Sequence, residues 1–167
     1  MGTQPAGSFI SLSYDDVASI RFFGNDRKAY WTQDGKVSIT ERIADLHSQY
    51  ASIMERCRQV DEQVYDDAYN TGGEKYAEIC CAVYRQVCAA HKLVSDSEGN
   101  LLYMSRENDS GGFINTLDVT YPSQPLFWIY SPTLAKAMIT PILQYAYTGR
   151  WNKDWTAHDL GAYPKAN

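Results

Sequence analysis

The chain has 167 residues, of which 44% are apolar and 13% aromatic, and thirteen of them are Tyr. This length suits one domain that buries a core without metal or disulfide bonds. The net charge of −5 argues against a nucleic-acid partner because no basic stripe is present to neutralise phosphates, and no run of roughly 20 apolar residues predicts a membrane span.

The N-terminal stretch MGTQPAGSF lacks the basic-then-apolar pattern of a signal peptide. We predict that residues 1–11 are a linker or leader and that residues 12–167 form a single helical domain. Ser13 and Asp16 have the spacing of a capping box. They predict a first helix through YDDVASIRFF as far as Gly24.

A second capping box, Ser38 with Glu41, begins a long amphipathic pattern that ends at Gly72-Gly73. Its apolar positions follow one another at spacings of four and three, which predicts a helix. These positions are Ile39, Ile43, Leu46, Tyr50, Ile53, Cys57, Val60 and Val64. Such a helix is unusually long, so a break near Arg58–Asp61 remains open.

A third helix is predicted over Gly73–Lys92, with apolar residues on so much of its circumference that it must pack on more than one side. The segment VSDSEGNLLYMS then predicts one short β-hairpin near Leu93–Met104, with its turn at Asp96–Asn100. A loop rich in Gly, Asn and Ser is expected from Arg106 to Pro125.

Ser131-Pro132 marks the start of a last helix, which should run to Gly149 and kink or restart at Pro141. The remaining tail is predicted to be a loop. Helical hairpins joined by long polar loops indicate an all-α fold, and specifically part of an (α/α)6-toroid-like domain. The chain contains too few hairpins to close such a ring, so we expect a piece of a larger helical-hairpin domain.

The four cysteines do not form a CxxC pair, which argues against a zinc site. We expect them to be small buried apolar residues. They are Cys57, Cys80, Cys81 and Cys88. No metal and no cofactor is expected.

Two segments carry residues suited to chemistry, the loop at 106–122 and the tail at 151–167. Carboxylates, an imidazole and aromatic walls are the groups of a hydrolase that activates water and protonates a leaving group. The same residue types are more common in solvated surface loops, so both interpretations stay open. The candidates are Glu107, Asn108, Asp109, Asn115, Asp118, Tyr121, Trp151, Trp155, His158, Asp159, Tyr163 and Lys165.

Two further expectations concern charged side chains. Because neighbouring loop residues rarely face each other, His158 and Asp159 are not expected to form a His–Asp relay. Arg85 lies on the third predicted helix and is expected to face solvent, although it is also a candidate to neutralise Glu107 or Asp118 if the loops fold back over it.

Three blocks of the chain resemble the glutaminase A family of fungal and bacterial extracytoplasmic proteins. They are EKYAEICCAVYRQVCAAHKLV, SRENDSGGFINTLDVTYPSQPLFWIYSPTLAKAMITPILQYA and WTAHDLGAYPKAN. The resemblance runs from about Leu12 to Asn167 and covers a segment catalogued as a domain of unknown function that leads into a six-helical-hairpin domain. It implies hydrolysis of L-glutamine to L-glutamate and ammonia, and a secreted or periplasmic location of the full-length parent.

The resemblance also suggests site residues, because related toroid glycosidases share an NT-x-DV stretch after a Glu and a downstream HD-[IL]-G loop. Here these match Asn115–Val119 after Glu107, and His158–Gly161. By this carry-over Glu107 is the leading catalytic carboxylate, with Asp118 and Asp159 beside it. Candidate substrate contacts are Asn115, Tyr121, His158, Tyr163 and Arg85.

Three functions follow from this combination. The first is an amidohydrolase acting on glutamine, the second a glycoside hydrolase using paired carboxylates on a sugar, and the third a non-catalytic helical module that supports or binds a partner. The expected partners are a small-molecule substrate and neighbouring domains of the same parent. Family chains continue past the equivalent of Asn167, so we expect the isolated chain to show little hydrolysis.

Overall fold

The computed structural model describes residues 8 and 10–166, and in them five α-helices and five short strands. In chain order these are β1 (Ile20–Phe22), β2 (Asn25–Arg27), a 3-10 turn η1 (Tyr30–Thr32), α1 (Ile39–Ser48), α2 (Tyr50–Gly72), α3 (Glu74–Ala89), β3 (His91–Ser95), β4 (Leu101–Ser105), α4 (Leu117–Tyr130), α5 (Pro132–Tyr147) and β5 (Lys165–Ala166). The fold is mostly helical, as expected. The linker predicted at residues 1–11 falls largely outside the described residues.

The β-hairpin forms where the sequence predicted it. Strands β3 and β4 pair antiparallel from His91 opposite Ser105 to Ser95 opposite Leu101. Asp96 closes the turn, because its Oδ1 accepts hydrogen bonds from the backbone N–H groups of Glu98 and Asn100 at 2.9 and 2.8 Å. This is an Asx-type turn, in which a side chain replaces a backbone acceptor.

The helix predicted from Ser13 to Gly24 is wrong, because Ile20–Phe22 is a β-strand. Strand β1 pairs antiparallel with β2 and parallel with β5 from the far end of the chain. Ile20 and Phe22 point into the core while Arg21 between them is exposed, which is the period-two burial of a strand. Asp16 accepts hydrogen bonds from Ser19 Oγ and Lys92 Nζ and caps no helix.

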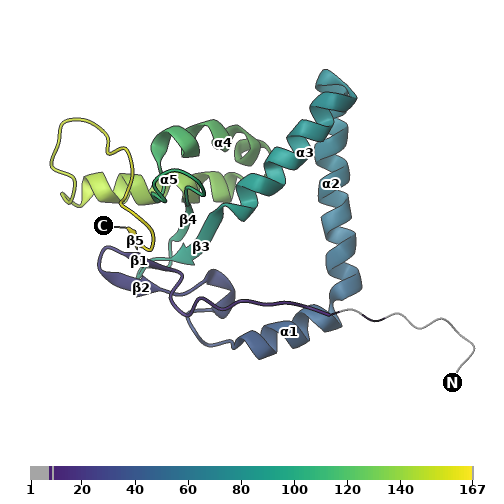
Figure 1. Ribbon diagram of the computed structural model, residues 1–167, viewed down its shortest axis with the longest axis horizontal. Coiled ribbons are helices and arrows are strands. Elements are labelled where there is room, and N and C mark those ends of the chain that lie inside the picture. The colour runs from purple at the N-terminus through teal and green to yellow at the C-terminus, as the bar shows by residue number, and fades with distance from the viewer. Residues whose placement is uncertain (1–7, 9, 167) are drawn as a thin grey trace, which may run out of the picture.

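The long amphipathic pattern forms two helices that meet at Gln49, and the chain stays helical through Arg58–Asp61. Figure 1 shows α1 at the lower edge of the view and α2 rising from its end in a different direction. The helical spacing of apolar residues continues across the junction, so periodicity alone did not reveal the bend. Gln49 has φ −106° and ψ 8°, outside the helical region.

The capping box at Ser38 forms as predicted. Ser38 Oγ accepts a hydrogen bond from the Glu41 N–H at 3.2 Å, and the Ser38 N–H donates to Glu41 Oε2 at 2.7 Å. Replacing Ser38 by Ala is expected to lower the free energy of unfolding by about 1 kcal/mol, because it removes this acceptor from the first turn of α1. Chemical denaturation checks this, with the neighbouring exposed Thr40→Ala as the control; equal losses in the two variants would contradict the cap.

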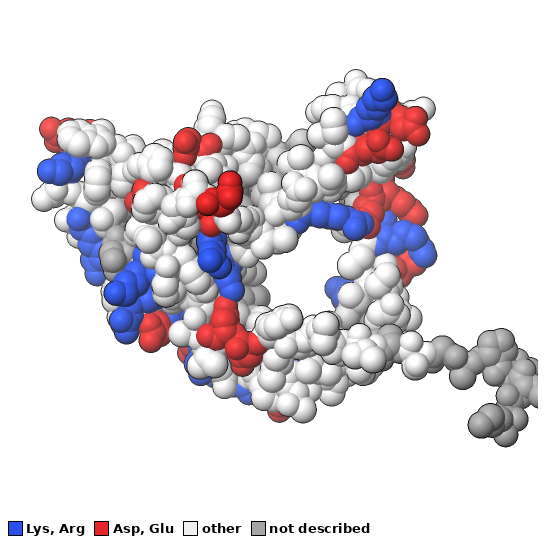
Figure 2. All heavy atoms as spheres, viewed as in Figure 1, with Lys and Arg blue, Asp and Glu red and all other residues white. Residues whose placement is uncertain are grey.

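Helices α2 and α3 form an antiparallel hairpin whose turn is at Gly73, with φ +77°. Val64, Ala68 and Ala77 are buried. Figure 2 shows that α2 stands away from the rest of the molecule, so that an opening remains between it and the body. On this face acidic and basic side chains are interspersed, without an extended basic stripe.

The loop expected from Arg106 to Pro125 is shorter than predicted, because α4 begins at Leu117 and contains both Pro122 and Pro125. Each proline removes one backbone donor from the helix. Tertiary contacts offset this loss: Phe127 is completely buried, and Thr120 and Ser105 share a hydrogen bond of 3.1 Å between their hydroxyl groups. Helix α5 likewise continues through Pro141, which is buried.

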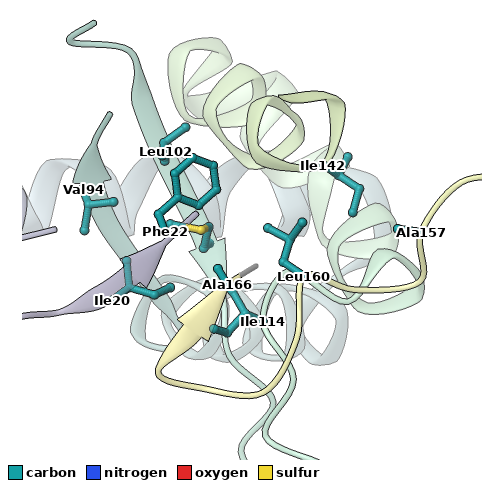
Figure 3. Packing of buried hydrophobic residues seen from close by; sticks show 10 residues of the cluster. Ile20, Phe22, Val94, Leu102, Ile114, Ile142, Ala157, Leu160 and Ala166 are labelled. Atoms are coloured by element: carbon teal, nitrogen blue, oxygen red, sulfur yellow. The ribbon is translucent and has the colours of Figure 1, made fainter. Parts of the chain in front are cut away.

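One hydrophobic core joins the two ends of the chain (Figure 3). Its buried residues come from β1, the β3–β4 hairpin, α5, the 106–116 segment and the tail. They are Ile20, Phe22, Val94, Leu102, Met104, Ile114, Ile142, Ala157, Leu160 and Ala166. A second cluster around Phe127 and Met138 packs α4 and α5 against α3 and the hairpin.

The four cysteines are free. They were expected to be buried, but none of them is fully buried. Cys57 is exposed, and the other three are partly buried. They lie on the α2–α3 hairpin, which has few neighbours to cover it. Among the described residues, no helix combines the length and apolar character that crossing a membrane requires.

Candidate active site

The C-terminal tail is held along the segment 106–117 by backbone hydrogen bonds. The N–H of Ile114 donates to the carbonyl of Gly161 at 2.8 Å, and the N–H of Leu160 donates back to Ile114 at 2.9 Å. The N–H of Leu117 donates to the carbonyl of His158 at 2.7 Å. These bonds set His158 beside the start of α4.

His158 lies between two carboxylates. Its Nδ1 is 2.9 Å from Asp159 Oδ2, and its Nε2 is 3.5 Å from Asp118 Oδ1. The expectation that His158 and Asp159 would not face each other is therefore wrong. Asp159 is turned toward the ring because its other oxygen accepts a hydrogen bond from the Gly161 N–H at 2.7 Å, which closes a tight loop.

The carboxylates raise the pKa of His158. The hydrogen bond that His158 donates to Asp159 is the largest cause, and the negative charges of Asp118, Asp159 and Glu107 add to it. The imidazolium form is thus favoured in the folded protein, and its stabilising effect is lost as the pH rises through the raised pKa. The side chains of His158 and Asp118 are 62% and 74% exposed, whereas that of Asp159 is only 22% exposed.

Replacing Asp159 by Asn is expected to lower the pKa of His158, because the substitution removes the strongest stabiliser of the imidazolium. NMR titration of the His158 ring protons checks this. Asp109 is an exposed carboxylate in the loop region, and Asp109→Asn is the control, which should leave the pKa of His158 unchanged. An unchanged His158 titration in the Asp159 variant would contradict the arrangement.

His158, Asp118 and Asp159 form the His158 cluster. Glu107 organises the loop that faces this cluster. Its Oε2 accepts hydrogen bonds from Ser110 Oγ at 2.7 Å and from the N–H groups of Gly111 and Phe113 at 3.0 and 3.3 Å. Its Oε1 accepts one from Thr116 Oγ1 at 2.9 Å. These bonds, led by those from Ser110 and Thr116, lower the pKa of Glu107 to about 2. A carboxylate with so low a pKa is a weak proton acceptor near neutral pH.

A cavity of about 620 Å³ lies next to the Glu107 loop, between the C-terminal half of α3 and the first half of α4. One wall is apolar, and the other is formed by the polar side chains of the loop. The lining residues are Val83, Val87, Ala90, His91, Ser105, Arg106, Glu107, Asn108, Asp109, Ser110, Val119, Pro122, Ser123 and Leu126. This volume is in the range of sites for small molecules.

His91, in the wall of this cavity, is a partly buried histidine. Its Nδ1 is 2.6 Å from the carbonyl of Val87, and its ring stacks on Tyr103 with 4.5 Å between centroids. Burial lowers the pKa of His91, so the neutral ring donates to Val87 through Nδ1. Its Nε2 is buried and has no hydrogen-bond partner among the described residues. His91 is the first residue of β3, and no motif of the sequence connects it with the loop.

The remaining candidates are dispersed around the cluster. Tyr121 is 64% exposed and lies one helical turn after Asp118. Tyr163 lies under the guanidinium of Arg106, 4.2 Å from it. Asn115 is fully buried with φ +55°, so its side chain faces the protein interior.

Arg85 does not reach the loop carboxylates. Its guanidinium forms an ion pair with Asp61 of α2, across the α2–α3 hairpin, and its side chain is 67% exposed. The possibility that Arg85 neutralises Glu107 or Asp118 is therefore wrong. Lys92, the next cation along the chain, pairs with Asp16. Among the described residues, no group of three or more His, Cys, Asp and Glu side chains is placed to hold a metal ion.

Sequence reasoning missed the two hydroxyl groups that hold Glu107, those of Ser110 and Thr116. The signal available was a carboxylate followed by Ser and a Gly-Gly pair, which is a composition typical of a turn closed around a side chain. Thr116 carried no such local signal because it reaches Glu107 only after the loop has folded back.

The chain matches two known domain families. The glutaminase A six helical-hairpin domain matches residues 73–167, and a domain of unknown function matches residues 1–67. The chain is 27% identical to glutaminase A of Aspergillus oryzae over 96% of its own length, and 30% identical to a probable glutaminase of Arthroderma benhamiae over 60%. It spans 24% and 12% of the lengths of these two relatives.

No solved structure matches the chain. The helical-hairpin match covers more than half of the residues and includes the loop, α4, α5 and the tail, in which the His158 cluster lies. The chain therefore belongs to the glutaminase A family.

Proposed function

We propose that this chain is part of a glutaminase A-like hydrolase that converts L-glutamine to L-glutamate and ammonia, and that the His158 cluster belongs to its active site. One observation carries the proposal: both ring nitrogens of an exposed histidine face carboxylates. The neighbouring Glu107 loop, though not the histidine or its two carboxylates, lines a cavity large enough for a small molecule. The names of the relatives supply the substrate class.

The geometry supports a general acid–base reaction at the side-chain amide of glutamine. Asp118, the more exposed carboxylate, takes a proton from a water molecule whose oxygen attacks the amide carbon. His158, kept protonated by Asp159, donates its proton to the departing nitrogen as the C–N bond breaks, so that ammonia leaves and a carboxylic acid forms. Proton exchange with solvent then restores both side chains.

In this proposal Glu107 is not the base that the family resemblance suggested. Its four hydrogen bonds hold the loop in place, and its charge supports the protonated state of His158. The proposal assigns Tyr121 and Tyr163 to substrate contacts at the rim of the site, whereas the Asn115 side chain is buried in the interior and contacts no substrate. Arg85, paired with Asp61, is left outside the site.

We also propose that neighbouring domains of a longer parent protein complete the site and that the parent acts outside the cytoplasm. Several large apolar side chains of α4, α5 and the tail are at least two-fifths exposed, which supports burial against further helices. They are Tyr121, Trp128, Ile129, Leu143, Tyr147 and Trp155.

The test is to assay the full-length parent for ammonia release from L-glutamine and for hydrolysis of a panel of aryl glycosides. Glutamine turnover that is lost on Asp118→Asn supports the proposal. Glycoside turnover instead would favour the paired-carboxylate alternative, and neither activity would favour a non-catalytic support module. Robust glutamine hydrolysis by purified residues 1–167 would contradict the requirement for neighbouring domains.

A further inference from the structure

A second cavity, of about 610 Å³, lies away from the His158 cluster. It is formed by the segment from β2 to α1, in the lower part of Figure 1, together with the turn of the β3–β4 hairpin. Its lining is rich in cations and aromatic rings. The lining residues are Arg27, Lys28, Ala29, Tyr30, Trp31, Gln33, Asp34, Lys36, Arg42, Ser95, Asp96, Ser97 and Gly99.

The cations of this cavity are largely without acidic partners. Arg27, Lys28 and Lys36 form no ion pair with any residue that the structure describes. Arg42 is engaged elsewhere, since it donates to the carbonyl of Trp31 and pairs with Asp45. The cavity therefore concentrates positive charge in a chain whose net charge is −5.

The two acidic residues of the lining offset only part of this charge. Asp96 accepts hydrogen bonds from the neutral N–H groups of Glu98 and Asn100 and from the side chain of Gln144, and it keeps its negative charge. Asp34 and Asp96 thus stand against three unpaired cations, which leaves an excess of positive charge. Such an excess attracts anions, and a concave site strengthens the effect.

Arg27 supplies an unused donor. Its Nε atom is buried and has no hydrogen-bond partner among the described residues. Buried donors in proteins are nearly always hydrogen-bonded. The guanidinium of Arg27, a residue of the cavity lining, forms no ion pair with the described residues and is left to bind an anion. A carboxylate or phosphate oxygen is the acceptor that suits a guanidinium best.

The turn next to these cations has a backbone that is costly to form. Gln33, Asp34 and Gly35 all have positive φ, at 49°, 60° and 80°. A Cβ added at Gly35 would lie 2.2 Å from Lys28 Nζ, so the absence of a side chain there lets the Lys28 amine lie against the turn. Consecutive residues with positive φ are uncommon and often mark a functional site.

The aromatic residues add an apolar surface beside the cations. Tyr30 is 52% exposed, and Trp31 next to it is partly buried; both come from η1. Tyr and Trp rings provide flat apolar faces with a polar edge, which suit the faces of sugar rings. The volume of the cavity corresponds to a small molecule.

We propose that this cavity binds an anionic sugar, with its carboxylate or phosphate group on Arg27, Lys28 and Lys36 and its ring against Tyr30 and Trp31. Binding here is independent of the hydrolase activity proposed above, because none of these residues belongs to the His158 cluster. The five residues proposed to bind the sugar lie in the part of the chain that matches a domain of unknown function, and the hairpin turn that completes the lining lies in the helical-hairpin match.

Isothermal titration calorimetry on the full chain tests this with four probes: glucuronate, glucose 6-phosphate, glucose and inorganic phosphate. At least one of the two anionic sugars is expected to bind saturably and more tightly than either glucose or phosphate. Comparing the two sugars shows whether a carboxylate or a phosphate is preferred. Binding should weaken as salt is added, because the contact is between charges.

Three variants locate the site. Lys28→Gln combined with Lys36→Gln is expected to weaken binding of the anionic sugar by about tenfold, because two charge-assisted contacts are lost. Tyr30→Ala should weaken binding of the sugar but not of inorganic phosphate. Lys75→Gln, an exposed lysine at the start of α3, is the control and should bind normally.

Each variant is first shown to melt at the temperature of the unmodified chain, so that a loss of binding is not a loss of folding. Absence of saturable binding by both anionic sugars would overturn the proposal. So would equal affinity in the double lysine variant and in Lys75→Gln, or phosphate binding as tight as that of the sugars.

Discussion

Replacing His158 by Gln in the full-length parent is expected to reduce kcat/KM for L-glutamine by about 10²–10⁴-fold, the usual contribution of a positioned general acid. Gln retains a hydrogen-bonding group of similar reach but cannot carry the proton that the leaving nitrogen needs. His47→Gln is the matched control, since His47 is an exposed histidine on α1. Activity equal in the two variants would remove His158 from the mechanism.

The same proposal predicts how activity depends on pH. Because His158 acts in its protonated form, activity should fall as the pH rises through its raised pKa. Asp159→Asn should move this fall to lower pH, because it removes the carboxylate that most stabilises the imidazolium and so lowers the pKa of His158. A purely structural role for His158 would leave the position of the fall unchanged in the Asp159 variant, which distinguishes the two roles.

Replacing Phe127 by Ala is expected to lower the free energy of unfolding by about 3–5 kcal/mol, the usual loss for a fully buried Phe. Phe127 is 0% exposed, and its ring lies 5.9 Å from that of Tyr84, 5.6 Å from that of Tyr103 and 6.1 Å from that of His91, between centroids. It thus joins α4 to α3 and to the hairpin, the three elements around the cavity beside Glu107.

Denaturation of the full chain by urea measures this loss. Trp128→Ala is the control, because Trp128 follows Phe127 on the same helix but is 55% exposed. Trp128→Ala should lower the free energy of unfolding by no more than about 1 kcal/mol, as expected for a half-exposed residue away from the core. If the two variants lost similar stability, the packing around Phe127 would not be the link between these elements.

Local features of the fold were predictable where neighbouring residues decide them. Ser38 and Glu41 satisfy each other's backbone donors within one helical turn, Gly73 tolerates the positive φ that separates α2 from α3, and Asp96 closes a hairpin turn with its own side chain. Each interaction spans only a few residues. The family resemblance was also readable, because its blocks occur in order along the chain.

The candidate site was only partly predictable. The sequence indicated that Glu107, Asp118, His158 and Asp159 belong together, and the backbone bonds of Ile114 and Leu117 to the tail do bring those segments side by side. The sequence did not indicate that His158 would sit between two carboxylates. Nor did it show that the Glu107 carboxylate would accept hydrogen bonds from the loop. Both features depend on side-chain directions that are set only in the folded loop.

Contacts between near neighbours, or residue order, were thus enough to predict the helix cap at Ser38, the α2–α3 turn, the hairpin and the family. Long-range pairing decided that Ile20–Phe22 is a strand, since its partner β5 comes from the other end of the chain. Tertiary packing also decided that α4 continues through Pro122, because burial of Phe127 offsets the lost backbone hydrogen bond. Local preferences are worth about 1 kcal/mol per residue or less, and about 3 kcal/mol for a proline inside a helix, so burial and long-range pairing can override them where the two disagree.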